Sequence, residues 1–280
     1  MDKSRSSFTE NIEDIPVFEG NMIELYDYRA KGYISGRGRS AAWEPLTFNS
    51  PTKKIVPQWR IPDSALNQSK KRRIADYRIA YCKVCSPTNQ RSLVSTIVPK
   101  GCICGDAVPT IYLGENYLPA HLLWTAIANT LAIDFLARKK VALNMTFSIV
   151  DTLPLPASKP LSEAERRVTR LAASLSLAGP EMDEAASIYA EGDPDWPRDR
   201  LEDPLKRHIA RAEIEAIYAM KILGLSRTEL EFILDPACVS NDFEDYETFG
   251  ALKRAELRQF GEYRTQRLVL EAWDRLFGGE

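Results

Sequence analysis

One segment of the sequence, residues 116–141, carries a long apolar helix pattern, and from Leu118 to Ala137 it is apolar on nearly every side. Large apolar residues recur in it at helical spacing, at Leu118, Leu122, Leu123, Ile127, Leu131, Phe135 and Leu136. A helix without a polar face is surrounded by protein, so we expect this one in the middle of a domain. It ends in three cations, which are favourable at a helix C-terminus: Arg138, Lys139 and Lys140.

A β-hairpin is predicted just before this helix. Residues 77–84 and 92–98 are rich in Tyr, Ile, Val and Thr, which favour strands. The connection at residues 86–91 carries hydroxyl, amide and guanidinium groups, the kinds that contact base edges and phosphates. A solvent-exposed loop without any binding role would also be polar, so this alternative stays open.

The remaining segments complete an α+β pattern. Gly and Pro recur through residues 29–62, which predicts loops and short strands, and further strands are predicted at residues 109–113 and 143–150. After residue 162 the pattern is helical, with capping boxes at Ser162 and Ser226 and a last helix expected over residues 257–277. We therefore expect three regions: a loose leader at 1–15, a β-rich domain around the buried helix at 16–156, and a helical support domain at 157–280.

Charge is unevenly distributed along a chain whose net charge is −2. Residues 20–110 carry 15 basic and 6 acidic side chains, whereas residues 111–280 carry 20 basic and 28 acidic ones. A basic block between acidic flanks indicates contact with a polyanion, although local excesses of this size also arise by chance. The candidate phosphate contacts are Arg37, Arg39, Lys53, Lys54, Lys70, Lys71, Arg72, Arg73, Lys139 and Lys140.

Four cysteines suggest a possible metal site. Cys82, Cys85, Cys102 and Cys104 have the number and approximate spacing of a four-thiolate zinc site. However, Cys82 and Cys85 lie three apart on a predicted strand, which would direct their sulfurs to opposite faces. Buried, unligated thiols are therefore the alternative interpretation.

The sequence gives little sign of hydrolytic or membrane function. The two histidines, His121 and His208, lie in helical patterns, and no Ser or Cys is placed beside them as a nucleophile. No segment has the length and apolarity of a membrane span or a secretory signal. We therefore expect a cytoplasmic protein that does not contact a membrane.

Several strings, taken in order, carry a resemblance to a known family. They are PVFEGNMI at 16–23, YDYR at 26–29, SPTNQRSLVSTIVP at 86–99, FLARKK at 135–140 and LPLP at 153–156, followed by segments 216–234 and 261–270. As a set they resemble the C-terminal half of large adenine-specific DNA methyltransferases. That family includes type IIG restriction-modification enzymes and the methyltransferases of the BREX and DISARM phage-defence systems.

In that family this half is the target-recognition region, while a preceding domain holds S-adenosylmethionine and flips the adenine. The resemblance implies that this chain is a sequence-specific, double-stranded DNA-binding segment. Its positions and chemistry make Thr88, Asn89 and Arg91 candidates for DNA contact, with Asn144 and Thr146 as further candidates.

The family's catalytic motifs are missing. The sequence contains no Asn-Pro-Pro-Tyr or Asp-Pro-Pro-Tyr tetrad and no Phe-x-Gly-x-Gly loop. We therefore expect no catalytic residues and no cofactor in this chain, with S-adenosylmethionine held by a partner methyltransferase domain or subunit. Two alternatives remain: an interaction module of a defence complex, such as the remnant of a split gene, and a zinc-binding module.

Overall fold

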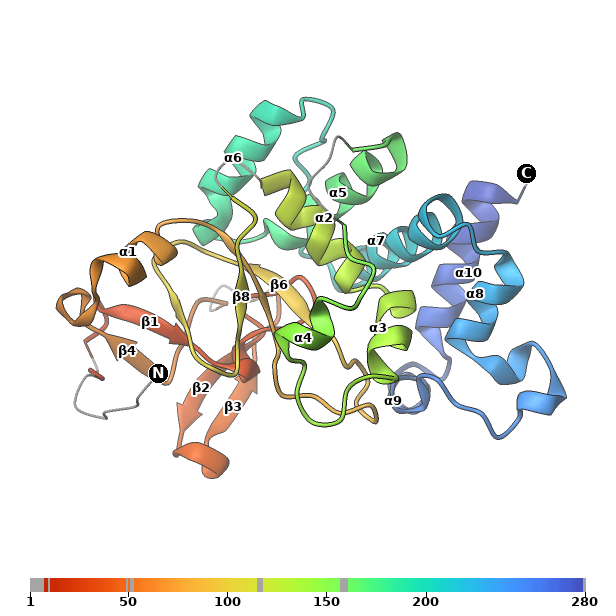
Figure 1. Ribbon diagram of the computed structural model, residues 1–280, viewed down its shortest axis with the longest axis horizontal. Coiled ribbons are helices and arrows are strands. Elements are labelled where there is room, and N and C mark those ends of the chain that lie inside the picture. Colours follow the sequence, from red (N-terminus) through yellow and green to blue (C-terminus); the bar gives the residue numbers. More distant parts are fainter. Residues whose placement is uncertain are drawn as a thin grey trace.

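The computed structural model describes residues 8–9, 11–48, 50, 53–114, 118–156 and 161–278. The predicted α+β class is confirmed: small sheets occupy the first part of the chain, and the C-terminal part is helical (Figure 1). In Figure 1 the sheets lie at the left and helices α7, α8 and α10 at the right, with α2 between them. Much of the predicted leader, residues 1–15, lies outside the described residues.

The strands form three small sheets. In the first, β1 (Ile15–Phe18) lies between β4 (Trp59–Ile61) and β7 (Ile103–Cys104). The second pairs β2 (Lys31–Ser35) with β3 (Ala42–Pro45), and the third has the order β6 (Ser95–Val98), β5 (Arg78–Tyr81), β8 (Thr110–Ile111). The predicted hairpin is confirmed, because β5 and β6 pair antiparallel from Arg78 opposite Val98 to Tyr81 opposite Ser95.

The predicted central helix is buried as expected, but the expectation of one continuous helix was wrong. It consists of α2 (Leu118–Ala128) and α3 (Leu131–Arg138), which meet at an angle of 63°. Thr130 causes the break, because its hydroxyl caps α3 by accepting a hydrogen bond from the Ile133 N–H. The predicted start at residue 116 lies outside the described residues.

Two further expectations need correction. Residues 143–150 do not form a strand; Thr146 caps the short helix α4 (Phe147–Val150), and only the isolated bridge between Val84 and Asn144 resembles strand pairing within this described segment. The predicted last helix is two helices, α9 (Gly250–Phe260) and α10 (Arg264–Phe277). Gly261 separates them with φ of 76°, the left-handed conformation that commonly ends a helix.

The other helices agree with the local signals in the sequence. Both capping boxes are present, at the start of α5 (Glu163–Ser176) and of α8 (Arg227–Leu234). Helix α7 (Pro204–Ile217) continues as a π-helical turn at Tyr218–Ile222, and α1 (Gln68–Ile74) precedes the hairpin. Helix α6 (Asp183–Gly192) was not predicted. Short 3₁₀ turns lie at Gly20–Met22, Gly38–Ser40, Asp63–Ala65, Pro180–Met182, Pro236–Cys238 and Asn241–Phe243.

The main hydrophobic core crosses the expected boundary near residue 156. It joins Phe18 and Ile97 of the sheets and Ile127 of α2 to Val168 of α5 and Ile214 of α7. A second cluster holds α8 and α10 against α3 and α7. Among the described residues no single helix is long and apolar enough to cross a membrane; α2 and α3 reach that length only as the bent pair.

Candidate nucleic-acid interface

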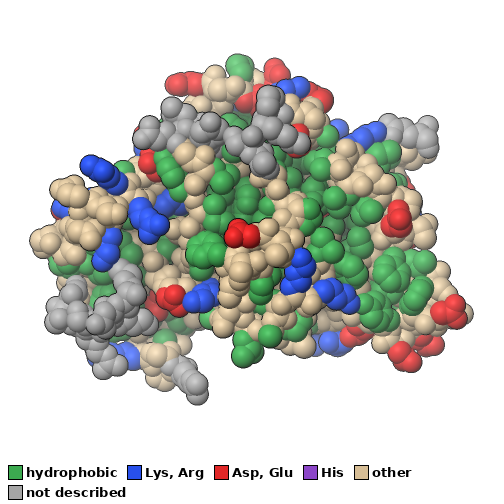
Figure 2. All heavy atoms as spheres, viewed as in Figure 1, with side chains coloured by type: hydrophobic (Ala, Val, Ile, Leu, Met, Phe, Trp, Pro, Cys, Tyr) green, Lys and Arg blue, Asp and Glu red, His purple; other side chains and the backbone are tan. Residues whose placement is uncertain are grey.

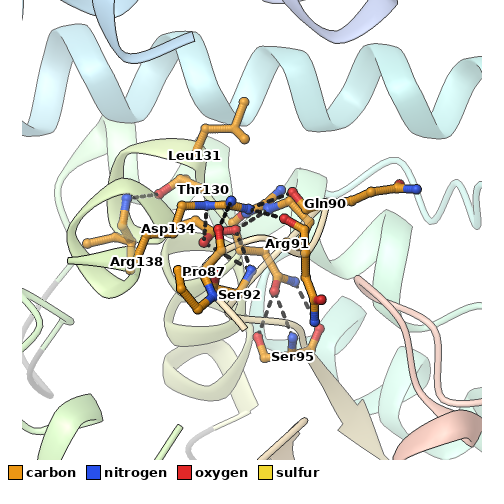
Figure 3. Close-up of polar contacts among 12 residues, drawn as sticks. Pro87, Gln90, Arg91, Ser92, Ser95, Thr130, Leu131, Asp134 and Arg138 are labelled. Atoms are coloured by element: carbon orange, nitrogen blue, oxygen red, sulfur yellow. Dashed lines mark hydrogen bonds and ion pairs between the residues drawn. The ribbon is translucent and has the colours of Figure 1, made fainter. Parts of the chain in front are cut away.

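The loop at residues 86–91 is fixed by α3 (Figure 3). The guanidinium of Arg138 donates hydrogen bonds to the carbonyl oxygens of Pro87 at 2.7 Å, Asn89 at 2.8 Å and Gln90 at 2.7 Å. Because these bonds use the backbone, they set the shape of the loop without engaging its side chains; the hydroxyls of Ser86 and Thr88 bond to each other at 2.8 Å. Thr88 and Asn89, both predicted DNA contacts, are exposed.

Asp134 is the buried centre of this arrangement. Its carboxylate accepts hydrogen bonds from Arg91 Nε at 2.6 Å, the Ser92 N–H at 3.1 Å and Arg138 Nε at 3.2 Å. These charge-assisted bonds satisfy a carboxylate that has no exposure to solvent. One ionic cluster around Asp134 therefore holds the end of the loop at Arg91 and Ser92, and through Arg138 it also holds the loop backbone.

Arg91 takes a structural position that the sequence did not indicate. Its side chain is 12% exposed, and it also donates to the carbonyl oxygen of Asn129. Burial works against its charge, but Asp134 and Glu215 outweigh burial and raise its pKa. Arg91 thus supports the loop, whereas the prediction had placed it against DNA.

A basic groove lies between α1 and α4. It has a volume of about 580 Å³, and its walls include Lys70 and Arg73 of α1, Lys83 before the loop, and Thr146 at the start of α4. Lys70 and Arg73 are three residues apart on one helix, so they share a face. Neither side chain has a hydrogen-bond or ion-pair partner in the described part of the chain, whereas Lys83 pairs with Asp106 at 2.8 Å.

The local sequence of α1 sets where the helix begins and therefore which way its cations point. The side chain of Asn67 caps the helix by accepting a hydrogen bond from the Lys70 N–H at 2.9 Å. Lys71 pairs with Asp63, and Arg72 is exposed. The predicted basic run is therefore a helix that presents Lys70 and Arg73 to the groove.

Other predicted cations lie elsewhere. Arg37, in the β2–β3 connection, lies over the Trp59 ring at 5.7 Å, and Lys54 is exposed. The side chain of Arg39 is outside the described part of the structure. Lys139 donates to the Tyr246 hydroxyl, and Lys140 donates to Thr152.

These positions bring only some of the candidates together. Figure 2 shows Lys and Arg side chains over the region of α1 and again near α3 and α4 on one face of the molecule. Asn144 and Thr146, both exposed, adjoin α4. Lys70, Arg73 and Thr146 thus line one groove and Lys140 contacts Thr152 just after α4, whereas Arg37 and Lys54 belong to a different part.

Lys53 does not have the position that was predicted for it. Its side chain is 2% exposed, and its ammonium donates to Asp27 Oδ2 at 2.7 Å and to the carbonyl oxygens of Arg29 at 2.8 Å and Leu46 at 2.7 Å. Burial lowers its pKa, and Asp27 opposes that shift. Lys53 is a buried structural cation without a surface from which to reach a phosphate.

The four cysteines considered for zinc do not form a ligand set. Among the described residues, no group of three His, Cys, Asp or Glu side chains is arranged to hold a metal ion. Cys82 Sγ donates to the Gly20 carbonyl oxygen at 3.5 Å, and Cys102 Sγ donates to that of Pro99 at 3.1 Å. Burial raises the pKa of Cys82 to about 12, which favours the neutral thiol over a thiolate ligand.

The sequence reasoning missed the residues that hold the loop. Asp134 and Arg138 lie four apart in a segment that was treated as apolar; Arg138 was interpreted only as a cation at the end of the helix, and Asp134 was not considered. A charged pair inside such a segment is the signal that could have identified them. Lys83 was missed because it belongs to a predicted strand.

Comparison with known proteins finds no matching family model, no similar curated protein and no similar solved structure. Functional inference therefore rests on the positions of these residues and on the resemblance of the sequence strings.

Proposed function

We propose that this chain is the target-recognition segment of an adenine-specific DNA methyltransferase of a restriction-modification or phage-defence system. It binds double-stranded DNA, and a partner methyltransferase domain or subunit holds S-adenosylmethionine and transfers the methyl group. The observation that carries the proposal is the groove between α1 and α4, where Lys70 and Arg73 lack partners among the described residues and lie beside Lys83.

The two surfaces have different tasks in this mechanism. The cations of the groove neutralise phosphates and position the duplex, which adds affinity without sequence preference. The side chains of Thr88 and Asn89 contact base edges, since hydroxyl and amide groups supply both donors and acceptors. Because Arg138 already fixes the loop backbone, little conformational entropy is lost when the loop meets DNA.

Fluorescence anisotropy with a short labelled duplex tests the proposal. We expect binding at about 50 mM salt that weakens as salt rises. The double variant Lys70→Gln/Arg73→Gln should bind more weakly and reduce the slope of log affinity against log salt by about 2. The matched control, Lys206→Gln/Arg258→Gln, removes two exposed cations of α7 and α9 and should change neither quantity.

Two results would contradict the proposal. Absence of duplex binding at about 50 mM salt would favour the interaction-module alternative. Equal losses in the groove variant and the control variant would show that the groove has no special part in binding.

A further inference from the structure

A second cavity, of about 740 Å³, lies against the loop at residues 86–91. The loop contributes Asn89 and Gln90 to its wall, α7 contributes His208 and Arg211, and α9 contributes Phe260. Its volume is in the range of small-molecule sites. The cavity therefore lies between the β-rich region and the C-terminal helices, and it is large enough for an organic ligand.

Arg211 is a guanidinium at this cavity without a partner. It makes no hydrogen bond or ion pair with any described residue, whereas Arg91 is bound by Asp134. Burial lowers the pKa of Arg211, and the positive charge of Arg91 lowers it further, while Glu256 and Glu24 favour its charge without contacting it. The side chain is only partly buried, so its guanidinium is open to the cavity, and a bound anion would supply the counter-charge that no described residue gives it.

Three carboxylates line the cavity: Glu215 and Glu256 are already engaged, and Glu24 is exposed and forms no ion pair with Arg211 in the described structure. Glu215 accepts hydrogen bonds from the Leu131 N–H at 2.8 and 2.9 Å. Glu256 accepts from the Thr265 N–H at 2.7 Å and from its hydroxyl at 2.6 Å. Glu215 and Glu256 are each held toward a donor other than Arg211, so neither replaces the missing anion.

Two neighbours show the same positive environment. The pKa of His208 is lowered to about 4, first by burial and then by the positive charges of Arg211, Arg264 and Arg207. Arg264 lies 3.5 Å from the centre of the Phe260 ring, and its Nε is buried without a hydrogen bond in the described structure, 3.6 Å from Glu262. Arg211 thus retains capacity to bind an acceptor, whereas Arg264 is already paired with Glu262.

We infer that this cavity binds a small molecule carrying a phosphate group, with Arg211 as the principal contact to the anion. A phosphate carries more than one negative charge and accepts the paired N–H groups of a guanidinium, which suits a site with several cations. The cavity is much larger than a phosphate ion alone, so it has room for an attached group of the size of a nucleoside. This inference does not depend on the proposed DNA binding, although the loop is common to both sites.

Isothermal titration calorimetry with inorganic phosphate and with nucleoside 5′-monophosphates tests the inference. We expect saturable binding that Arg211→Ala weakens about tenfold or more, because a charged hydrogen bond is lost. Arg211→Lys should be intermediate, since it keeps the charge and loses the paired geometry. Arg258→Ala removes an exposed guanidinium of α9 and should leave binding unchanged.

The melting temperature of Arg211→Ala is the folding control, and we expect it to lie close to that of the wild type because the variant removes a partly exposed side chain that makes no hydrogen bond or ion pair with the described residues. Absence of saturable binding of every probe at millimolar concentration would overturn the inference, as would equal affinity of wild type and Arg211→Ala. If the wild type binds duplex DNA but no phosphate probe, the cavity inference fails and the proposed function stands. If the probes bind and the duplex does not, the proposed function fails and the cavity inference stands.

Discussion

At the scale of single residues, the feature that most shapes the candidate interface is a carboxylate in an apolar helix. Asp134 has no solvent exposure, yet it is satisfied by two guanidiniums and a backbone N–H. The same contacts hold the loop that carries Thr88 and Asn89. The buried carboxylate of Asp134 therefore helps to hold the loop in one conformation.

We predict that Asp134→Ala lowers the free energy of unfolding by about 3–5 kcal/mol, because it removes the carboxylate that pairs with both Arg91 and Arg138. Urea denaturation followed by circular dichroism measures the change. Asp106→Ala is the matched control, since it removes an exposed partner of Lys83, and it should cost less than about 1 kcal/mol. A loss at Asp134 as small as at Asp106 would show that the cluster does not stabilise the fold.

Glu215 gives a prediction for pH. Burial raises its pKa from 4.5 to about 7, so the folded protein holds a proton that the unfolded chain releases in this range. Folding then takes up a proton, and the contribution of Glu215 to stability falls as pH rises from about 4.5 to about 7. Glu215→Gln removes this titration.

Between pH 8 and pH 5 the wild type should therefore gain about 2 kcal/mol in free energy of unfolding relative to Glu215→Gln. Urea titrations at several pH values measure the difference. Burial lowers the pKa values of His121 and His208 to about 4, so these residues reduce the free energy of unfolding as pH falls. The wild type and Glu215→Gln both contain them, so this effect cancels in the comparison. Parallel stability curves for the two proteins would rule the prediction out.

At the scale of elements, local signals in the sequence were reliable, and contacts between distant residues were not. The capping boxes at Ser162 and Ser226 predicted helix starts because cap and partner are three residues apart. The prediction of a strand at 143–150 was wrong. It relied on the alternation of polar and apolar residues and did not consider that Thr146 can cap a helix.

The same distinction explains which residues of the candidate site could be predicted from the sequence. The basic run of α1 could be predicted because its residues are consecutive. The assignments of Lys53 and Arg91 differ from their observed positions because their partners, Asp27 and Asp134, are 26 and 43 residues away in the chain. The position of Arg211 could not be predicted from the sequence, because it depends on how α7 packs. That packing places Arg211 at the cavity, where it has no partner among the described residues.

The connection after α5 makes a prediction about one glycine. Gly179 has φ of 107°, and a Cβ there would collide with the guanidinium of Arg29 and the hydroxyl of Tyr28. Gly179→Ala should therefore destabilise the protein by about 2 kcal/mol or more. Gly192→Ala is the control, because a Cβ at the end of α6 meets no atom within 4 Å, and it should be close to neutral. Thermal unfolding compares the two, and equal melting temperatures would contradict the prediction.

At the scale of the whole molecule, the two expected regions are held together by buried contacts. Arg207 of α7 donates to the Tyr26 carbonyl oxygen at 3.2 Å and to those of Leu175 and Leu201 at 2.8 Å. Arg29 reaches the Ala178 carbonyl oxygen at 3.4 Å. With a main core that also crosses the boundary near residue 156, the β-rich region and α5–α7 share most of their stabilising contacts.

We predict that the β-rich region and α5–α7 unfold in one cooperative transition. Arg207→Ala should lower the midpoint equally whether unfolding is followed by the fluorescence of Trp43 and Trp59, with the other three tryptophans replaced by Phe, or by helical circular dichroism. Arg207 is 7% exposed and joins both regions, so its loss removes contacts from each. Arg258→Ala, at an exposed position of α9, should move neither midpoint. If the tryptophan signal and the helical signal separated into two transitions, the two regions would be independent units and the prediction would be wrong.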